Sequence, residues 1–267
     1  MFPELLHIGR YSLPTYGVLV ASGVLLGLWI SVRNSQRQGI DPDHAWNFGI
    51  VIVLSGIIGA KVLYVINDWS FYSTHPGEIL TLNTLQAGGV FSGGLLAALA
   101  AAVWYIRKHK LPALAILDAF APGLALGHAI GRLGCFAAGC CFGKETHRFW
   151  GVTFTNPFAA ANSGTPLNVP LEPTQLFEFA VELANFFLLM WLFKRKKFDG
   201  QVFGAYLFLY GIARYFLEFL RGDPGRGSVF GGAMTGTQLI SIGLVLLGAL
   251  IWWLRPQPKA LPLPARG

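Results

Sequence analysis

The feature that most constrains this chain is a succession of long apolar stretches, each close to the length needed to cross the roughly 30 Å hydrocarbon core of a bilayer. Only 12% of its 267 residues are charged, whereas about a quarter are charged in an average soluble domain. The mean hydropathy is +0.52. The sequence therefore predicts an all-α integral membrane protein with about seven transmembrane helices. The predicted spans are Leu13–Val32, Trp46–Ile66, Gly88–Ile106, Ala113–Ala137, Thr174–Phe193, Val202–Leu220 and Gln238–Leu254.

Lys and Arg are distributed unequally between the two sides of these spans. Twelve fall in one alternating set of connections and in the C-terminal tail, and five fall in the opposite set. Because cytoplasmic loops carry an excess of Lys and Arg, the pattern predicts a cytoplasmic C-terminus and an N-terminus outside. The net charge of +7 has the same origin and does not indicate a nucleic-acid partner.

The chain is predicted to form a single polytopic domain over residues 1–255, followed by a Pro-rich, disordered cytoplasmic tail at 256–267. The first apolar stretch lacks a clear cleavage site and is interpreted as a retained helix rather than a signal peptide. The connection at residues 139–173 is rich in Gly, Pro, Asn and Thr. It predicts an extracytoplasmic loop or small head rather than a helix.

Ionisable residues occur inside the predicted spans, where a charge is costly and usually faces a polar cavity. One such stripe follows a single face of the sixth span, with gaps of four, four, four and three residues. Arg214 and Glu218 can pair at i,i+4 on this face. The stripe is either a structural ion pair that fixes helix packing or part of a functional site. Its members are Tyr206, Tyr210, Arg214, Glu218 and Arg221.

A second polar stripe follows one face of the fifth span at gaps of three, four and three: Gln175, Glu178, Glu182 and Asn185. Glu182, in its middle, is a candidate partner for Arg214 or Lys61. The alternative is hydrogen bonding between helices without any chemistry.

The fourth span carries Asp118, His128 and Arg132, and ends in a Gly- and Cys-rich stretch up to Lys144. His128 and Arg132 lie one turn apart on the same face. An arginine among glycines near the outer surface can hold a phosphate through its guanidinium and nearby backbone N–H groups. The alternative is an arginine that extends to lipid headgroups.

Cys135, Cys140 and Cys141 lie within seven residues of one another. Their spacing fits no structural zinc pattern, and only His147 is near, so neither a metal site nor a cofactor is predicted. A Cys135–Cys140 disulfide and simple packing both remain open. A glycine patch with Ser92 at its centre opens the third span and permits close helix approach or an irregular backbone.

At these residues the chain resembles bacterial prolipoprotein diacylglyceryl transferases, from about Tyr16 to Leu254. The most specific match is the stretch from Gly131 to Gly143, which is similar to the family signature. The supporting matches are Tyr16-Gly17, Gly59-Ala60-Lys61, Gly93-Gly94-Leu95, Asp118 to Pro122, Pro173 to Glu178, Tyr210 to Phe219 and Met234 to Leu239.

The resemblance implies a reaction in the bacterial cytoplasmic (inner) membrane. The family moves the diacylglyceryl group of phosphatidylglycerol onto the lipobox cysteine of a preprolipoprotein signal peptide, and glycerol 1-phosphate leaves. Cations fixed beside the departing phosphate would stabilise the transition state. Membrane lipid and the two substrates are then the expected partners.

The resemblance also assigns residues. Arg132 and Arg214 match the two arginines that the family regards as essential, Glu218 is expected to orient Arg214, and Tyr16 matches a functional position. Ser92 stands where the best-known family form has a histidine proposed as the base, and His128 is the suggested substitute. Residues expected to bind substrate are Arg132, Gly143, Ser92, Gly93, Gly94, Lys61, Gln175, Glu182 and Tyr210.

Two other functions use the same residues. A transporter or channel would use the polar stripes as a pathway, and would be expected to show inverted repeats that the sequence lacks. A membrane thiol oxidoreductase would depend on the cysteines. The transferase interpretation adds one expectation: long lipid substrates must enter from the bilayer, through a lateral gap between spans.

Overall fold

The structure, a computed structural model, describes residues 4–8, 11–81, 84, 89–223 and 227–255. Among these residues, seven helices of 17 to 26 residues lie at the predicted spans, so the all-α membrane fold is confirmed. The long helices are α1 (Thr15–Arg37), α2 (Pro42–Asn67), α5 (Phe91–Lys108), α6 (Ala113–Ala138), α8 (Thr174–Phe193), α9 (Gln201–Leu217) and α10 (Gly236–Leu254).

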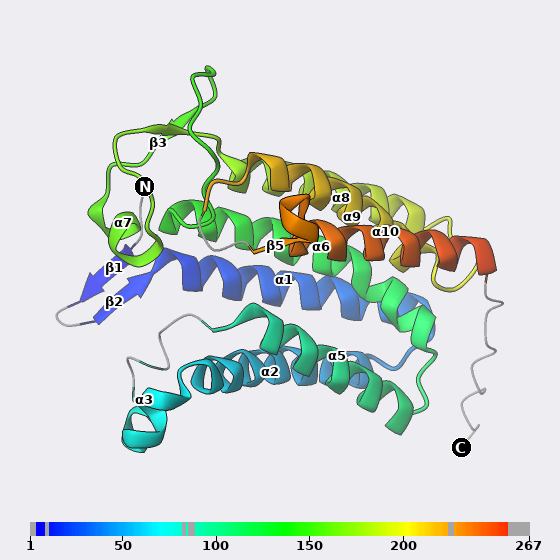
Figure 1. Ribbon diagram of the computed structural model, residues 1–267. Coiled ribbons are helices and arrows are strands. Elements are labelled where there is room, and N and C mark those ends of the chain that lie inside the picture. The colour runs from blue at the N-terminus through cyan, green and yellow to red at the C-terminus, as the bar shows by residue number, and fades with distance from the viewer. Residues whose placement is uncertain (1–3, 9–10, 82–83, 85–88, 224–226, 256–267) are drawn as a thin grey trace.

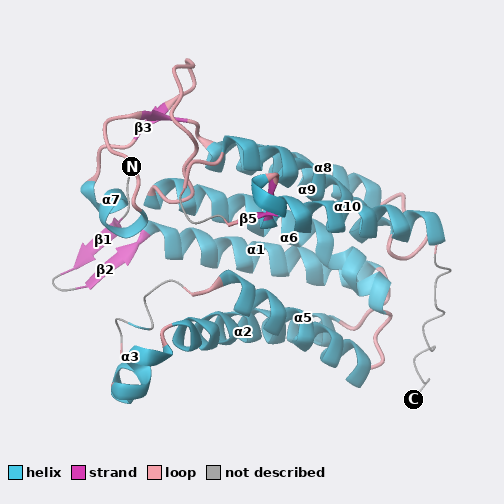
Figure 2. Cartoon of the chain, viewed as in Figure 1, coloured by secondary structure: helices cyan, strands magenta, loops and turns pink. Residues whose placement is uncertain are grey.

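Short elements connect these helices and gather mainly at one end of the molecule (Figure 2). The strands form three two-stranded antiparallel sheets. The short helices are α3 (Trp69–Thr74), η1 (Pro76–Leu80), α7 (Pro157–Ser163), η2 (Glu218–Leu220) and η3 (Phe230–Gly232). The strands are β1 (Glu4–Ile8), β2 (Tyr11–Pro14), β3 (Val152–Thr153), β4 (Pro170–Leu171), β5 (Ser228–Val229) and β6 (Met234–Thr235).

Three sequence expectations are corrected at the ends of elements. Leu13 lies in β2, because the first helix starts only after Pro14, which ends the strand. The connection at 139–173 contains the helix α7, capped at its start by the Asn156 side chain. Helix α9 ends at Leu217 and tightens into η2, so Arg221 does not lie on the helical face of Arg214. The predicted tail at 256–267 lies outside the described residues.

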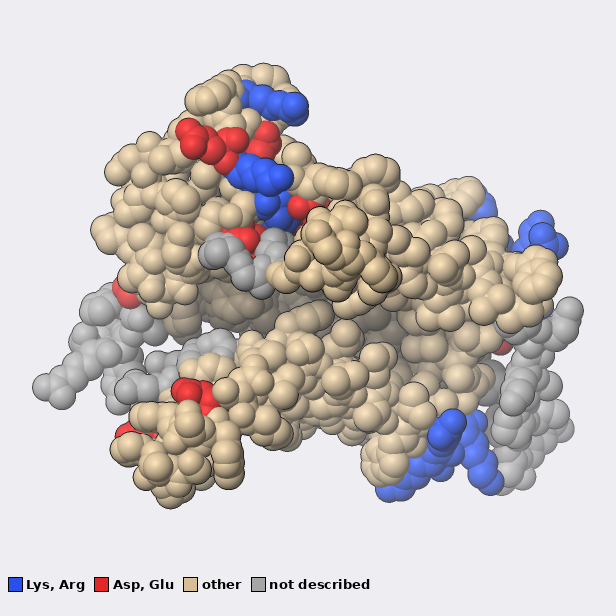
Figure 3. All heavy atoms as spheres, in the orientation of Figure 1, with Lys and Arg blue, Asp and Glu red and all other residues tan. Residues whose placement is uncertain are grey.

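Six of the helices are long and apolar enough to cross a membrane, and α5 is not among these six. Many of their large apolar side chains are exposed, among them Trp29, Leu54 and Ile58. Figure 3 shows charged side chains gathered at the two ends of the molecule, with an uncharged band between them. Apolar surface of this extent needs lipid rather than water around it. The chain is therefore a multi-pass membrane protein.

The helices form two layers (Figure 1). Helices α2 and α5 pack against each other in one layer, and α1, α6, α8, α9 and α10 form the other. Helix α1 contacts both α6 and α2 and so joins the layers. The largest apolar core includes Phe48, Ile116, Leu189 and Val202, from α2, α6, α8 and α9. This core lies toward the end of the bundle where α6 begins.

Facing glycines allow the closest helix contacts. A Cβ atom added to Gly123 in α6 would lie 2.3 Å from the carbonyl oxygen of Gly27 in α1. In the second layer, a Cβ on Gly93 in α5 would lie 2.5 Å from the carbonyl oxygen of Gly59 in α2. Lipid tails are as apolar as the side chains, so helix association in a membrane depends on such close packing. Gly93 and Gly94 of the glycine patch thus lie in regular helix that packs closely, and Gly89 precedes this helix.

Asp118 has a structural role at the end of the bundle opposite the small sheets. It is fully buried in α6, and its two carboxylate oxygens accept hydrogen bonds from the backbone N–H groups of Gly200, Val202 and Phe203 at 2.8–2.9 Å. These groups would otherwise be unpaired at the start of α9. Lys196 completes the network with a 2.9 Å ion pair to Asp118. The charge of Asp118 therefore caps a neighbouring helix.

Replacing Gly123 by Ala is expected to lower the free energy of unfolding by about 1–3 kcal/mol, because the new methyl group meets a backbone carbonyl that cannot rotate away. Thermal unfolding in detergent measures the change. Gly243→Ala is the matched control, since an added Cβ there meets no heavy atom within 4 Å. If the Gly123 variant unfolds at the same temperature as the control, α1 and α6 do not approach each other this closely.

Candidate active site

Arg132 is the centre of a buried polar cluster between α6 and α8. Its Nη2 lies 2.8 Å from Oε1 of Glu178, whose side chain is only 2% exposed. Its Nε donates a hydrogen bond to Nε2 of His128 at 3.2 Å. The one-turn spacing of His128 and Arg132 on α6 allows this second contact. The guanidinium therefore points into the protein and pairs with a carboxylate.

His128 lies between two carboxylates of α8. Its Nε2 is 3.3 Å from Oε1 of Glu178, and its Nδ1 is 3.9 Å from Oε2 of Glu182. Oε1 of Glu182 also accepts a hydrogen bond from Asn185 at 3.1 Å. The sequence suggested Arg214 or Lys61 as the partner of Glu182, but the structure places His128 and Asn185 there.

Arg214 approaches from α9 and forms the predicted i,i+4 ion pair, with Nη2 lying 2.9 Å from Oε2 of Glu218. The other oxygen of Glu218 accepts a 2.9 Å hydrogen bond from the hydroxyl of Thr235. Thr235 also caps α10, in a reciprocal arrangement with Gln238. The orientation of Arg214 is thus fixed through Glu218 to the start of α10.

The two arginines belong to one cluster. Arg132 and Arg214 both lie within electrostatic range of Glu178 and of Tyr210. The Tyr210 ring packs edge-on against His128, with 5.5 Å between the ring centroids. Tyr206 stacks on Tyr210 one turn earlier, at 5.8 Å between centroids. The polar stripes of α8 and α9 therefore meet at the end of α6.

Several buried polar atoms of this cluster have no hydrogen-bond partner among the described residues. They are Oε1 of Gln175, Oε2 of Glu178, Oε2 of Glu182 and Nη1 of Arg214. Buried polar groups without partners are rare in folded proteins. The Nη1 group of Arg214 is a cationic donor that remains available to an anionic group bound in the cluster.

Gly143 lies at a junction of three chain segments. Its backbone N–H donates to the carbonyl of Glu172 at 3.0 Å, and it forms a β-bridge with Arg221. A Cβ atom at Gly143 would lie 2.4 Å from the Glu172 carbonyl oxygen and 2.9 Å from that of Leu220. Only glycine fits this site. The junction ties the segment after α6 to the residues just before α8 and just after η2.

Tyr16 is the second residue of α1 and lies beside the same end of α6. A Cβ on Gly134 would lie 3.2 Å from the Tyr16 ring, so the tyrosine packs over this glycine. Tyr16 is 45% exposed and lies within electrostatic range of Arg132 and Cys135. It therefore borders the cluster and is itself partly exposed.

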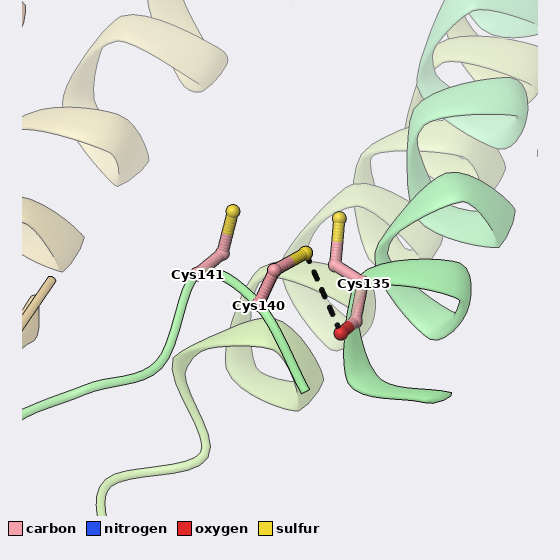
Figure 4. Close-up of side chains that lie close together, drawn as sticks. All are labelled: Cys135, Cys140 and Cys141. Carbon is pink, nitrogen blue, oxygen red and sulfur yellow. Dashed lines mark hydrogen bonds between the residues drawn. The ribbon is translucent and has the colours of Figure 1, made fainter. Parts of the chain in front are cut away.

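Cys135, Cys140 and Cys141 are free thiols in the structure, so the disulfide that the spacing allowed is not formed. Their sulfur atoms lie within 4.8 Å of one another. Figure 4 shows the three side chains together, with the thiol of Cys140 donating to the Cys135 carbonyl at 3.7 Å. The fold thus brings together three free thiols, for which the sequence had left a disulfide and simple packing open.

Arg221, beyond η2, borders these thiols. It forms 2.7 and 2.9 Å hydrogen bonds with the carboxylate of Asp223. Burial opposes its charge, but the hydrogen bond to Asp223 and contact with Cys141 raise the pKa of Arg221. Hydrogen bonds from Cys135 and Cys140, followed by the charges of Arg221 and Arg132, lower the pKa of Cys141.

Four of the residues expected to bind substrate lie in the other layer. Ser92, Gly93 and Gly94 lie in the first turn of α5, and Lys61 lies on α2. Lys61 donates a 2.8 Å hydrogen bond to the carbonyl of Thr84. Among the contacts of the described residues, none joins Ser92 to the cluster around Arg132. The two glycines contact α2.

A family model described as prolipoprotein diacylglyceryl transferase matches residues 3–254. The chain belongs to the prolipoprotein diacylglyceryl transferase family. A phosphatidylglycerol–prolipoprotein diacylglyceryl transferase of Clostridium tetani is 35% identical over 253 residues, which cover 94% of this chain and 97% of the relative. A protein of the same name from Finegoldia magna is 34% identical, and the match covers 88% of this chain and 88% of the relative. Another, from Geobacillus kaustophilus, is 31% identical, and the match covers 94% of this chain and 91% of the relative.

The sequence stripes locate most of the cluster, but they name no partner for Arg132. The structure shows that this partner is Glu178. The missed signal was the motif from Pro173 to Glu178, which ends on this glutamate. Thr235 was also missed, because its link to Glu218 joins elements that the sequence does not pair.

Replacing Glu178 by Gln is expected to lower the free energy of unfolding by about 3–5 kcal/mol, because it leaves the buried guanidinium of Arg132 without its countercharge. The Arg132→Gln/Glu178→Gln double variant should lose less than the sum of the two single variants. Thermal or denaturant unfolding in detergent completes the cycle. Glu145→Gln, at an exposed position, is the control. Additive losses would exclude a direct Arg132–Glu178 interaction.

Proposed function

We propose that the cluster around Arg132 and Arg214 is the active site at which the diacylglyceryl group of phosphatidylglycerol is transferred to the lipobox cysteine of a preprolipoprotein. The protein is a transferase of lipoprotein biosynthesis, as its family membership indicates, and the transporter alternative has no support. The reaction is assigned to the bacterial cytoplasmic membrane. The observation that carries this site assignment is that two arginines from different helices lie in one buried cluster. Arg132 pairs with Glu178, and Arg214 lies within electrostatic range of the same carboxylate.

The chemistry is a displacement at the glyceryl carbon that bears the phosphate. The cysteine sulfur forms a thioether bond to this carbon while the carbon–oxygen bond to the phosphate breaks. The leaving glycerol 1-phosphate gains the electron pair and thus negative charge. Fixed cations in a site of low dielectric constant stabilise such charge far more than they would in water.

Arg132 and Arg214 are proposed to hold this phosphate. A guanidinium can donate two parallel hydrogen bonds to phosphate oxygens. Arg214 uses Nη2 for Glu218 and retains Nη1, which is buried without a partner among the described residues. Arg132 keeps its orientation through Glu178 and His128. Both arginines are therefore positioned before substrate binds.

His128 is proposed to accept the proton of the substrate thiol. It is partly exposed and lies between the carboxylates of Glu178 and Glu182. The thiolate, rather than the thiol, is the nucleophile. Ser92 is a poor base, and it lies in the first turn of α5, in the other layer.

The lipid substrates are proposed to enter laterally. Figure 3 shows the surface hollowed between the two layers, on the side where α10 faces α5. Lipid tails can remain in the bilayer there while the headgroup reaches the arginines. Crosslinking α5 to α10 through introduced side chains should stop turnover, whereas crosslinking α5 to its packing partner α2 should not. Unchanged turnover with the α5–α10 crosslink would exclude this route.

Replacing either Arg132 or Arg214 by Ala is expected to reduce transfer by about 10²- to 10³-fold, the usual effect of losing one preorganised donor to a developing anion. The assay follows a labelled diacylglyceryl group from phosphatidylglycerol to a lipobox peptide, using purified protein in detergent–lipid micelles. Arg148→Ala, in the exposed part of the head, is the matched control. Full activity of both variants, or inactivity of the folded unmodified protein, would contradict the proposed site or function respectively.

A further inference from the structure

The three cysteines occupy a position that the transfer reaction does not use. The nucleophilic thiol of that reaction belongs to the substrate. Cys135 comes from the last turn of α6, and Cys140 and Cys141 come from the segment after its left-handed C-cap, Gly139. All three are partly accessible. Packing would not require three sulfur atoms to lie within 4.8 Å of one another, close together as Figure 4 shows them.

The backbone is shaped to bring the thiols together. Adjacent residues in an extended segment point to opposite sides, but Cys141 has a φ of 61°. This left-handed conformation is unfavourable for a residue with a side chain. Its surroundings hold it in place, since Gln175 donates to the Cys140 carbonyl at 2.7 Å and Thr174 to the Cys141 carbonyl at 2.8 Å. Such conformations concentrate at functional sites.

We propose that Cys135, Cys140 and Cys141 form a binding site for a zinc ion with three thiolate ligands. Sulfur atoms bound to one tetrahedral zinc at about 2.3 Å are about 3.8 Å apart. The thiols here lie within 4.8 Å of one another, so small side-chain rotations complete the geometry. Three protein ligands leave a fourth position for solvent, as in zinc sites that exchange ligands.

The surrounding charge suits this occupant. Three thiolates and one Zn²⁺ carry a net charge of −1. Nη1 of Arg132 lies 3.9 Å from Sγ of Cys135, and Arg221 contacts Cys141. These cations compensate the excess negative charge in a partly buried place. The bound ion would tie the end of α6 to the segment that carries Gly143, and so fix the border of the site beside Arg132.

The test measures zinc directly and does not depend on transfer activity. The full chain in detergent is reduced with a phosphine, treated with Zn²⁺, passed through a desalting column and analysed for metal. About one zinc per chain is expected. Co²⁺ in its place should give the intense sulfur-to-cobalt absorption of a thiolate site.

Cys→Ser at any one of the three positions is expected to weaken zinc binding by at least about 100-fold, because loss of an outer-shell partner alone costs about 10- to 100-fold. Zinc should also raise the unfolding temperature of the unmodified protein and not that of a folded Cys→Ser variant. His147→Ala, at an exposed position on the same loop, is the control and should bind zinc unchanged. The absence of retained zinc, formation of a disulfide in its place, or loss of binding in His147→Ala would overturn the three-thiolate site.

Discussion

The ion pair between Arg132 and Glu178 is the interaction on which the rest of the site depends. Each charge would be costly inside the bilayer alone, and each becomes tolerable only beside the other. The pair joins α6 to α8, and His128 extends it to Glu182. Because both partners are held by helices rather than loops, the guanidinium has one defined position.

Close packing makes that position possible. The glycines of α1 and α6 let the two backbones nearly touch, and Asp118 fixes the start of α9 against the other end of α6. Asp118 and Arg132 are fourteen residues apart, or about 21 Å along the helix. One helix thus carries a structural charge at one end and a site charge at the other.

The site is assembled from parts that fix one another. Arg214 is oriented by Glu218, which is held by Thr235 at the start of α10. The junction at Gly143 then connects the segment after α6 with those beside α8 and η2. The three thiols lie in that same segment, beside Arg132. A substitution in this loop can therefore alter the position of Arg132 through only a few contacts.

Hydropathy and helical spacing by themselves determined the membrane fold, the approximate ends of its helices and the pairing of Arg214 with Glu218, because these depend on residues close in sequence. Only the tertiary structure decided three other features. These are the partner of Arg132, the proximity of Cys135 to Cys141, and the separation of Ser92 from the arginines. They depend on how α6, α8 and the loop after α6 pack, and a left-handed residue or a facing glycine sets that packing. Local periodicity carries no information about contacts between helices.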